Sequence, residues 1–190
     1  MEIIQLVNLV KTLTLTTDRL VIKKIAACNF DDMVAHEQNE VLMRYIRPVT
    51  SLQDTEKKVR ACIDDWQGKE DEWLMLVVSL KEKQTSLIGM VCIKIESLEF
   101  KHFEIGYRFH TDFHGKGYAF EAAKCVTDFL FTKVKIHKML AYCVSEHQAS
   151  YRLMEKLGMQ REACLREHST LAGVWHDELI YGLLAQGYSS

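Results

Sequence analysis

Proline is almost absent from this sequence, and so are the features that mark linkers, membrane spans and secretion signals. The 190 residues include one proline, Pro48, and no linker-like or low-complexity stretch. We therefore expect one domain over residues 1–190. No run reaches the roughly 18 apolar residues of a membrane span. The apolar segment MEIIQLVNLV includes Glu2 and lacks a basic region, so we do not expect a signal peptide.

The sequence also lacks the patterns of nucleic-acid binding, disulfides and metal sites. Its formal net charge is −2 and no lysine- and arginine-rich run occurs, which argues against nucleic-acid binding. The six cysteines form no CxxC pair, and there is no HExxH. His110 and His114 are four residues apart but fall in a glycine-containing turn. We expect reduced, mostly buried thiols in the cytoplasm, no metal and no membrane partner.

Hydrophobic periodicity divides the chain into strands and helices. A period of two predicts strands, and a period near 3.6 predicts helices. We expect strands at residues 19–25, 73–80, 87–95, 103–109, 138–145, 160–168 and 174–184, and helices at residues 30–39, 54–66, 117–134 and 148–157. Asp54 or Ser51 would cap the second helix, residues 81–85 would form a hairpin turn, and Gly158 would end the last helix.

Residues 103–145 have the order strand, helix, strand. A crossover of this length makes the two strands parallel and the connection right-handed. The predicted fold class is therefore α/β of the α+β type. It has a mixed, largely antiparallel central sheet of about six or seven strands, one parallel β-α-β unit and about four helices.

The stretch HGKGYAFEA places two glycines where a long helix begins. Gly115 and Gly117 would follow the strand at 103–109, at the edge where open α/β sheets bind ligands. A helix N-terminus favours an anion such as phosphate, and Lys116 adds a positive charge. The spacing fits neither Walker A nor GxGxxG. A simple turn with glycines at positive φ is the alternative reading.

The segment EIGYRFHTDFHGKGYAFEA resembles the central motif of the GNAT superfamily of N-acetyltransferases. TTDRLVIKKI, SEHQASYRLMEKLGMQREACLREH and GVWHDELIYGLL resemble the ribosomal-protein N-acetyltransferase branch. The resemblance covers about residues 14–185. It implies a GNAT-like fold, acetyl-CoA as cosubstrate and a protein N-terminus as acceptor. Homodimers are common in that branch, so a homodimer is an expectation that the resemblance alone carries.

The resemblance also implies a set of acetyl-CoA contacts. Backbone amides of the glycine turn would hold the pyrophosphate, and a backbone N–H of residues 107–109 would bind the oxyanion. His114 and His147 stand where the family has Gln or Arg and Asn. The expected contacts are Tyr107, Arg108, Phe109, His114, Gly115, Lys116, Gly117, Tyr118, Ala119, Cys143, His147 and Ser150.

Direct transfer of an acetyl group to an amine needs a base for the amine and an acid for the leaving thiolate. Met154 stands where the family often has a tyrosine that protonates the thiolate, so Ser150 is our candidate acid. The alternative is that the Ser150 hydroxyl has only a structural role. Glu104 is the first candidate base, although Arg108 on the same face could pair with it. Glu167 or His168 is the second candidate, and a water chain is the third.

The acceptor would bind between the N-terminal helices and the last hairpin. Residues 44–48, Trp66 and Trp73 could line that pocket. Trp73, however, starts an apolar strand, so we expect it in the hydrophobic core. Five acidic residues on the two N-terminal helices read as ordinary solvated faces: Asp31, Asp32, Glu37, Asp64 and Asp65. A small amine such as a polyamine or aminoglycoside is the alternative acceptor, and a non-catalytic CoA-binding regulatory module is the alternative function.

Overall fold

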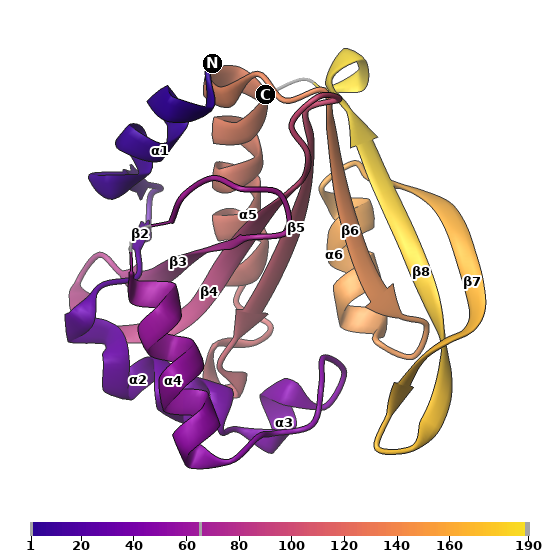
Figure 1. The fold of residues 1–190 in the computed structure, drawn as a ribbon, viewed down its shortest axis with the longest axis horizontal. Coiled ribbons are helices and arrows are strands. Elements are labelled where there is room, and N and C mark those ends of the chain that lie inside the picture. Colours follow the sequence, from indigo (N-terminus) through magenta and orange to yellow (C-terminus); the bar gives the residue numbers. More distant parts are fainter. Residues whose placement is uncertain (1, 65, 189–190) are drawn as a thin grey trace.

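The computed structural model describes residues 2–64 and 66–188, and a single mixed sheet runs through them (Figure 1). Its strand order is β1-β2-β3-β4-β5-β6-β8-β7, and every neighbouring pair is antiparallel except β5 and β6. The strands are β1 (Thr14–Thr16), β2 (Leu20–Lys24), β3 (Trp73–Leu80), β4 (Lys83–Ser97), β5 (His102–Phe109), β6 (Lys138–Val144), β7 (Gln160–Leu171) and β8 (Val174–Leu184).

Helices cover both faces of the sheet through two separate apolar clusters. The helices are α1 (Ile3–Lys11), α2 (Phe30–Glu37), α3 (Glu40–Met43), α4 (Leu52–Ile63), α5 (Tyr118–Phe129) and α6 (Gln148–Lys156). The larger cluster joins α1, α5 and α6 to the sheet. The smaller one joins Met33 of α2 and Val59 of α4 to β3 and β4. No helix among the described residues has the length and apolar character that crossing a membrane requires.

The predicted parallel pairing of the two strands is confirmed, and the strands separate soon after they pair. β5 and β6 are parallel, with α5 between them in the chain. Their register covers only residues 102–104 against residues 138–140. β5 then continues to Phe109 and β6 to Val144 without facing each other, and the two ribbons diverge in Figure 1. One edge of β5 beyond residue 104 and one edge of β6 beyond residue 140 are therefore left without a partner strand.

The sheet has eight strands, so the expected six or seven were too few. The short strand β1 was missed, and β4 begins at Lys83, which leaves only residues 81 and 82 for the hairpin turn. β1 is an edge strand with exposed ends, and residues 83–85 at the start of β4 are polar and exposed, so both give a weak period-two signal.

The predicted helices also needed adjustment. α1 was not predicted, and the helix expected at 30–39 is two helices, because the Asn39 side chain accepts from the N–H groups of Val41 and Leu42 and caps a new one. Ser51, not Asp54, caps α4, which ends at Ile63; residue 65 of the predicted helix lies outside the described residues. The helix expected at 117–134 ends in a wider π-type turn at residues 130–134. Gly158 follows α6 at φ 88°, as predicted.

Candidate active site

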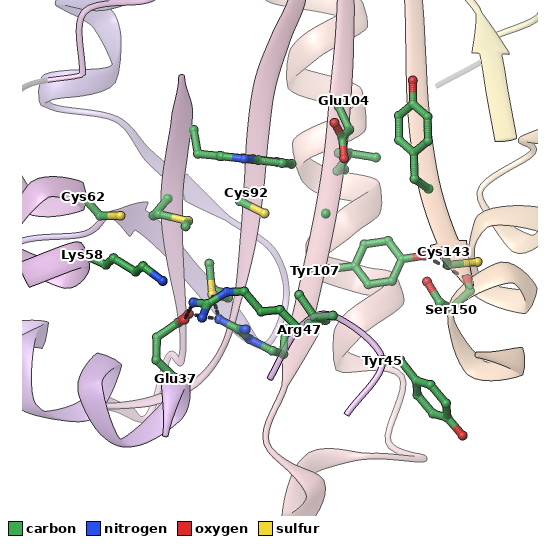
Figure 2. A pocket seen from close by; sticks show the side chains of 18 of the residues that line it. Glu37, Tyr45, Arg47, Lys58, Cys62, Cys92, Glu104, Tyr107, Cys143 and Ser150 are labelled. Atoms are coloured by element: carbon green, nitrogen blue, oxygen red, sulfur yellow. Dashed lines mark hydrogen bonds and ion pairs between the residues drawn. The ribbon is translucent and has the colours of Figure 1, made fainter. Parts of the chain in front are cut away.

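A cavity of about 590 Å³ lies between the N-terminal helices and the sheet (Figure 2). Its walls come from α2, α4, the segment after α3, strands β3 to β6 and α6. The separation of β5 from β6 opens one side of it, because residues 104–108 of β5 and residues 142 and 143 of β6 both line the cavity. The chemistry of this site therefore rests on which side chains these elements direct inward.

The two glycines of HGKGYAFEA both adopt the left-handed backbone region. Gly115 has φ 73° and Gly117 has φ 80°, and Gly117 directly precedes α5. A Cβ at Gly115 would meet no atom within 4 Å, so there is open space beside the turn. The first N–H groups of a helix have no intrahelical acceptor. The two interpretations of the glycine stretch, a turn at positive φ and an anion-binding site, are therefore compatible. The free N–H groups at the start of α5 are donors that fit a phosphate group.

Arg19, immediately before β2, connects this turn to the rest of the molecule. Its Nη1 donates to the Lys116 carbonyl at 3.1 Å, and its Nε donates to Glu121 of α5 at 2.7 Å. Its guanidinium also lies 4.4 Å from the ring centroid of Tyr118. Arg19 was not among the predicted site residues. Nothing in its local sequence marks it, because its partners are about 100 residues away in the chain.

The side chains of His114 and Lys116 face their own turn. His114 Nε2 is 2.7 Å from the Phe109 carbonyl, and Lys116 Nζ donates to the Asp112 carbonyl at 2.9 Å. Both therefore brace the loop between β5 and α5. The unusual histidine thus has a structural partner at the end of β5, while its predicted contact with acetyl-CoA stays a prediction.

The backbone of β5 offers free donors toward the separation from β6. His110 N–H donates to the Ile88 carbonyl on β4 at 2.9 Å. N–H groups alternate in direction along a strand, so those of Phe109 and Tyr107 point the opposite way, toward β6. β6 does not pair with these residues. Of the three predicted oxyanion donors, residues 107 and 109 have this orientation and Arg108 does not.

Four predicted residues meet where β5, β6 and α6 adjoin the cavity. The Tyr107 hydroxyl donates to the Ser150 carbonyl at 2.9 Å, and burial raises the pKa of Tyr107. Ser150 is buried in the first turn of α6 and lines the cavity with Cys143. Burial raises the pKa of Cys143 to about 11, which disfavours a nucleophilic thiolate. His147 stacks on Tyr45 with 4.8 Å between ring centroids; burial and nearby His114 lower its pKa.

Glu104 lines the same cavity and has an unusual ionisation. Burial and a hydrogen bond with Glu96 raise its pKa to about 7, although Lys94 opposes the rise with its Nζ 2.8 Å from the carboxylate. A carboxyl group with a pKa near neutrality is suited to accept and release protons. The alternative in which Arg108 pairs with Glu104 is wrong, because the Arg108 side chain extends to Glu37 instead.

Glu37 forms a buried ion cluster with two arginines, which Figure 2 shows at the wall of the cavity. Its carboxylate binds Arg47 and Arg108, and all three residues line the cavity. The expectation of a solvated Glu37 was therefore wrong. A sequence signal existed, since Glu37 is four residues after buried Met33 and falls on the inward side of α2. Asp31, Asp32 and Asp64 are exposed, and Asp65 lies outside the described residues.

The structure does not bring Glu167 and His168 to this cavity. Both are exposed on β7, where the register with β8 shifts. The Glu167 N–H donates to Asp177 at 2.9 Å, and His168 Nε2 lies 3.5 Å from Glu178. Trp66 and Trp73, the two tryptophans considered for the wall of the acceptor pocket, differ in their positions.

Trp66 is buried in the larger apolar cluster, whereas Trp73 lines the cavity beside Lys94. Trp73 begins a strand whose next residue, Leu74, faces the core. Alternation therefore turns Trp73 toward the cavity, and its assignment to the core was wrong.

Comparison with known proteins agrees with this architecture. Residues 19–160 match a family described as the acetyltransferase (GNAT) domain. The chain is 27% identical over 180 residues to the uncharacterized N-acetyltransferase YnaD of Bacillus subtilis (strain 168), covering 92% of this chain and 99% of the relative.

Two solved structures share the fold. One is RimL, a ribosomal L7/L12 alpha-N-protein acetyltransferase in complex with coenzyme A. It is 19% identical with a TM-score of 0.79, over 90% of this chain and 98% of that one. The other is a spermidine N-acetyltransferase from Vibrio cholerae in complex with CoA and spermine. It is 21% identical with a TM-score of 0.77, again over 90% and 98%.

Proposed function

Because the chain belongs to the acetyltransferase (GNAT) family and is an acetyl-CoA-dependent N-acetyltransferase, we propose that its acceptor is the α-amine of a protein N-terminus. The observation that carries the proposal is the cavity itself, which places Glu104 and Ser150 around the separation of β5 from β6. The charges of its walls favour this acceptor over a polyamine or an aminoglycoside. The described lining includes Arg47, Lys58 and Arg108 against only two carboxylates, so a multiply charged cation would meet repulsion.

The residues that would hold acetyl-CoA lie on one edge of the sheet. The N–H groups of the turn at 115–117 and of the first turn of α5 would bind the pyrophosphate. Cys143 and His147 would flank the arm that leads to the thioester, since they come from β6 and the start of α6. The Tyr107 and Phe109 N–H groups would bind the thioester oxygen as it becomes negative.

The reaction divides between two side chains. Glu104, as the carboxylate, takes the proton of the attacking ammonium, directly or through water, and so frees the nitrogen lone pair. The nitrogen forms a bond with the acetyl carbon and loses its second proton to solvent, and the bond from that carbon to sulfur breaks. Ser150 donates its hydroxyl proton to the departing thiolate, directly or through water, and recovers a proton from solvent. No covalent enzyme intermediate is required.

The test combines cofactor binding with turnover. Purified protein is titrated with acetyl-CoA by thermal shift, and thiol release is followed with N-terminal peptides, spermidine and an aminoglycoside as acceptors. We expect a thermal shift and fastest release with peptides. Fastest release with spermidine would reject the N-terminal acceptor. A shift without turnover of any amine would favour a non-catalytic CoA-binding module. Four departures from the family pattern support that alternative: His114, His147, Met154 and Ser169, the last at a position where some relatives have a carboxylate.

A further inference from the structure

The acceptor side of the cavity has a basic end, formed by Arg47, Lys58 and Arg108. Arg47 follows α3, Lys58 comes from α4 and Arg108 comes from β5. Figure 2 shows Lys58 directed toward Glu37 and Arg47, with Glu104 apart from them. None of residues 114–119 lines this cavity, so the basic end is separate from the turn that would bind the pyrophosphate.

The charges of the basic end do not balance within the protein. Glu37 is the carboxylate bound to Arg47 and Arg108, so one negative charge faces two positive ones. Glu37 and Arg108 are about nine-tenths buried, whereas the Arg47 side chain is 35% exposed. The Lys58 ammonium has no carboxylate or hydrogen-bond partner among the described residues. The basic end therefore carries an excess of two positive charges.

Lys58 is an exposed residue of α4 and Arg47 is partly exposed, so both cations remain accessible to an anion that enters the cavity. An arginine with part of its guanidinium exposed, next to an unpaired lysine, is a suitable pair of donors for a carboxylate. A polyamine would place further cations at the same point. The cavity thus has a proton acceptor at Glu104 and an anion-binding group apart from it.

We propose that the acceptor is an amine that carries a carboxylate, and that Arg47 and Lys58 bind this carboxylate while the amine lies at Glu104. The inference rests on the proposed acetyl transfer at this cavity and specifies the class of acceptor. The carboxylate can belong to an acidic side chain in the first residues of a peptide, or it can be the free carboxylate of an amino acid. Both sources present the same chemistry to the basic end.

The first experiment compares acceptors that differ only in charge. One arm uses C-terminally amidated peptides beginning Ala-Asp, Ala-Asn or Ala-Lys, and the other uses alanine against alaninamide. We expect kcat/KM to be roughly 10- to 100-fold higher for the anionic member of at least one arm, the usual range for a hydrogen bond to a charged group. The arm that shows the preference identifies the source. Equal kcat/KM within both arms would overturn the inference and leave the N-acetyltransferase activity standing.

Variants then locate the preference. Lys58→Gln and Arg47→Gln should lower the ratio of kcat/KM between the anionic acceptor and its neutral partner toward one. Lys58→Glu should shift the preference toward the Ala-Lys peptide. Lys57→Gln is the matched control, because Lys57 is the adjacent exposed lysine of α4 and does not line the cavity. An unchanged preference in both Lys58 variants would overturn the assignment.

Calorimetry separates this inference from the proposed reaction. The same peptides are titrated into protein saturated with CoA, where no transfer can occur. Tighter binding of the Ala-Asp peptide than of the Ala-Asn peptide would support anion binding at the basic end even if no peptide is acetylated. The absence of acetylation would then count against the proposed acetyl transfer alone. Equal binding of the two peptides, with binding of CoA intact, would contradict the inference.

Discussion

Replacing Glu104 with glutamine removes the proposed base while keeping the size of the side chain. Lys94 retains Glu96 as a partner at 2.8 Å, so we expect the fold to survive. A positioned general base contributes about 10²- to 10⁴-fold to a rate. We therefore expect Glu104→Gln to lower kcat by at least about 100-fold at pH 8, with affinity for acetyl-CoA little changed, because the residue lies away from the glycine turn.

The structure also predicts how this loss depends on pH. A base with a pKa of about 7 is about one-tenth ionised at pH 6, half at pH 7 and nine-tenths at pH 8. The ratio of wild-type to Glu104→Gln kcat/KM should therefore rise about fivefold from pH 6 to pH 7 and about twofold more by pH 8. Before the ratio is taken, each kcat/KM is divided by the fraction of the amine in the form that the protein uses, which is the ammonium for the wild type and the neutral amine for Glu104→Gln.

Thiol release measured from pH 5.5 to 9 with one peptide tests this reasoning. Glu96→Gln is the matched control, because loss of the neighbouring carboxyl should lower the pKa of Glu104 and move the inflection to lower pH without removing the base. A ratio that does not change with pH would refute the role of Glu104. So would a Glu104→Gln variant whose kcat lies within threefold of wild type.

Three further predictions concern other parts of the molecule. Ser150→Ala should lower kcat far more than affinity for acetyl-CoA in steady-state and calorimetric measurements, and an unchanged kcat would exclude Ser150 as the acid. Gly117→Val, which strains a residue at φ 80°, should abolish acetyl-CoA binding while circular dichroism shows an intact fold; Gly173→Val, at the same φ but on the β7–β8 turn, is its control and should keep binding. Burial lowers the pKa of His36 from 6.5 to about 3, so the unfolded chain binds the proton first and stability falls by about 5 kcal/mol as pH drops through this interval. His36→Leu should flatten that slope in urea titrations, and an unchanged slope would show that His36 is not its source.

Periodicity sufficed to predict the parallel unit and most helix and strand positions, because buried residues dominate their patterns. β5 was predicted from alternation of Phe103 and Ile105 with polar residues, and both are buried. The edge of the sheet was predicted less well. β1 has three residues and only partial burial, so packing with β2, rather than its own pattern, defines it.

The glycine turn could be found in the sequence because its glycines need positive φ, a local requirement. The basic end could not, because it depends on residues from α2, α4, β5 and the segment after α3 that only the tertiary fold brings together. The same limit applies to Arg108. Strand alternation places Arg108 on the same face as Glu104, but the choice of Glu37 as its partner depends on how α2 packs over the sheet.

The brief pairing of β5 with β6 means that the molecule consists of two half-sheets joined by a short seam at residues 102–104 and 138–140. On one face of the sheet, Ala122 and Ala123 of α5 are fully buried in an apolar cluster that also contains residues of both strands. We therefore expect that substitutions in this buried cluster can change the angle between the two half-sheets. Such substitutions would alter the affinity for acetyl-CoA without contacting the ligand.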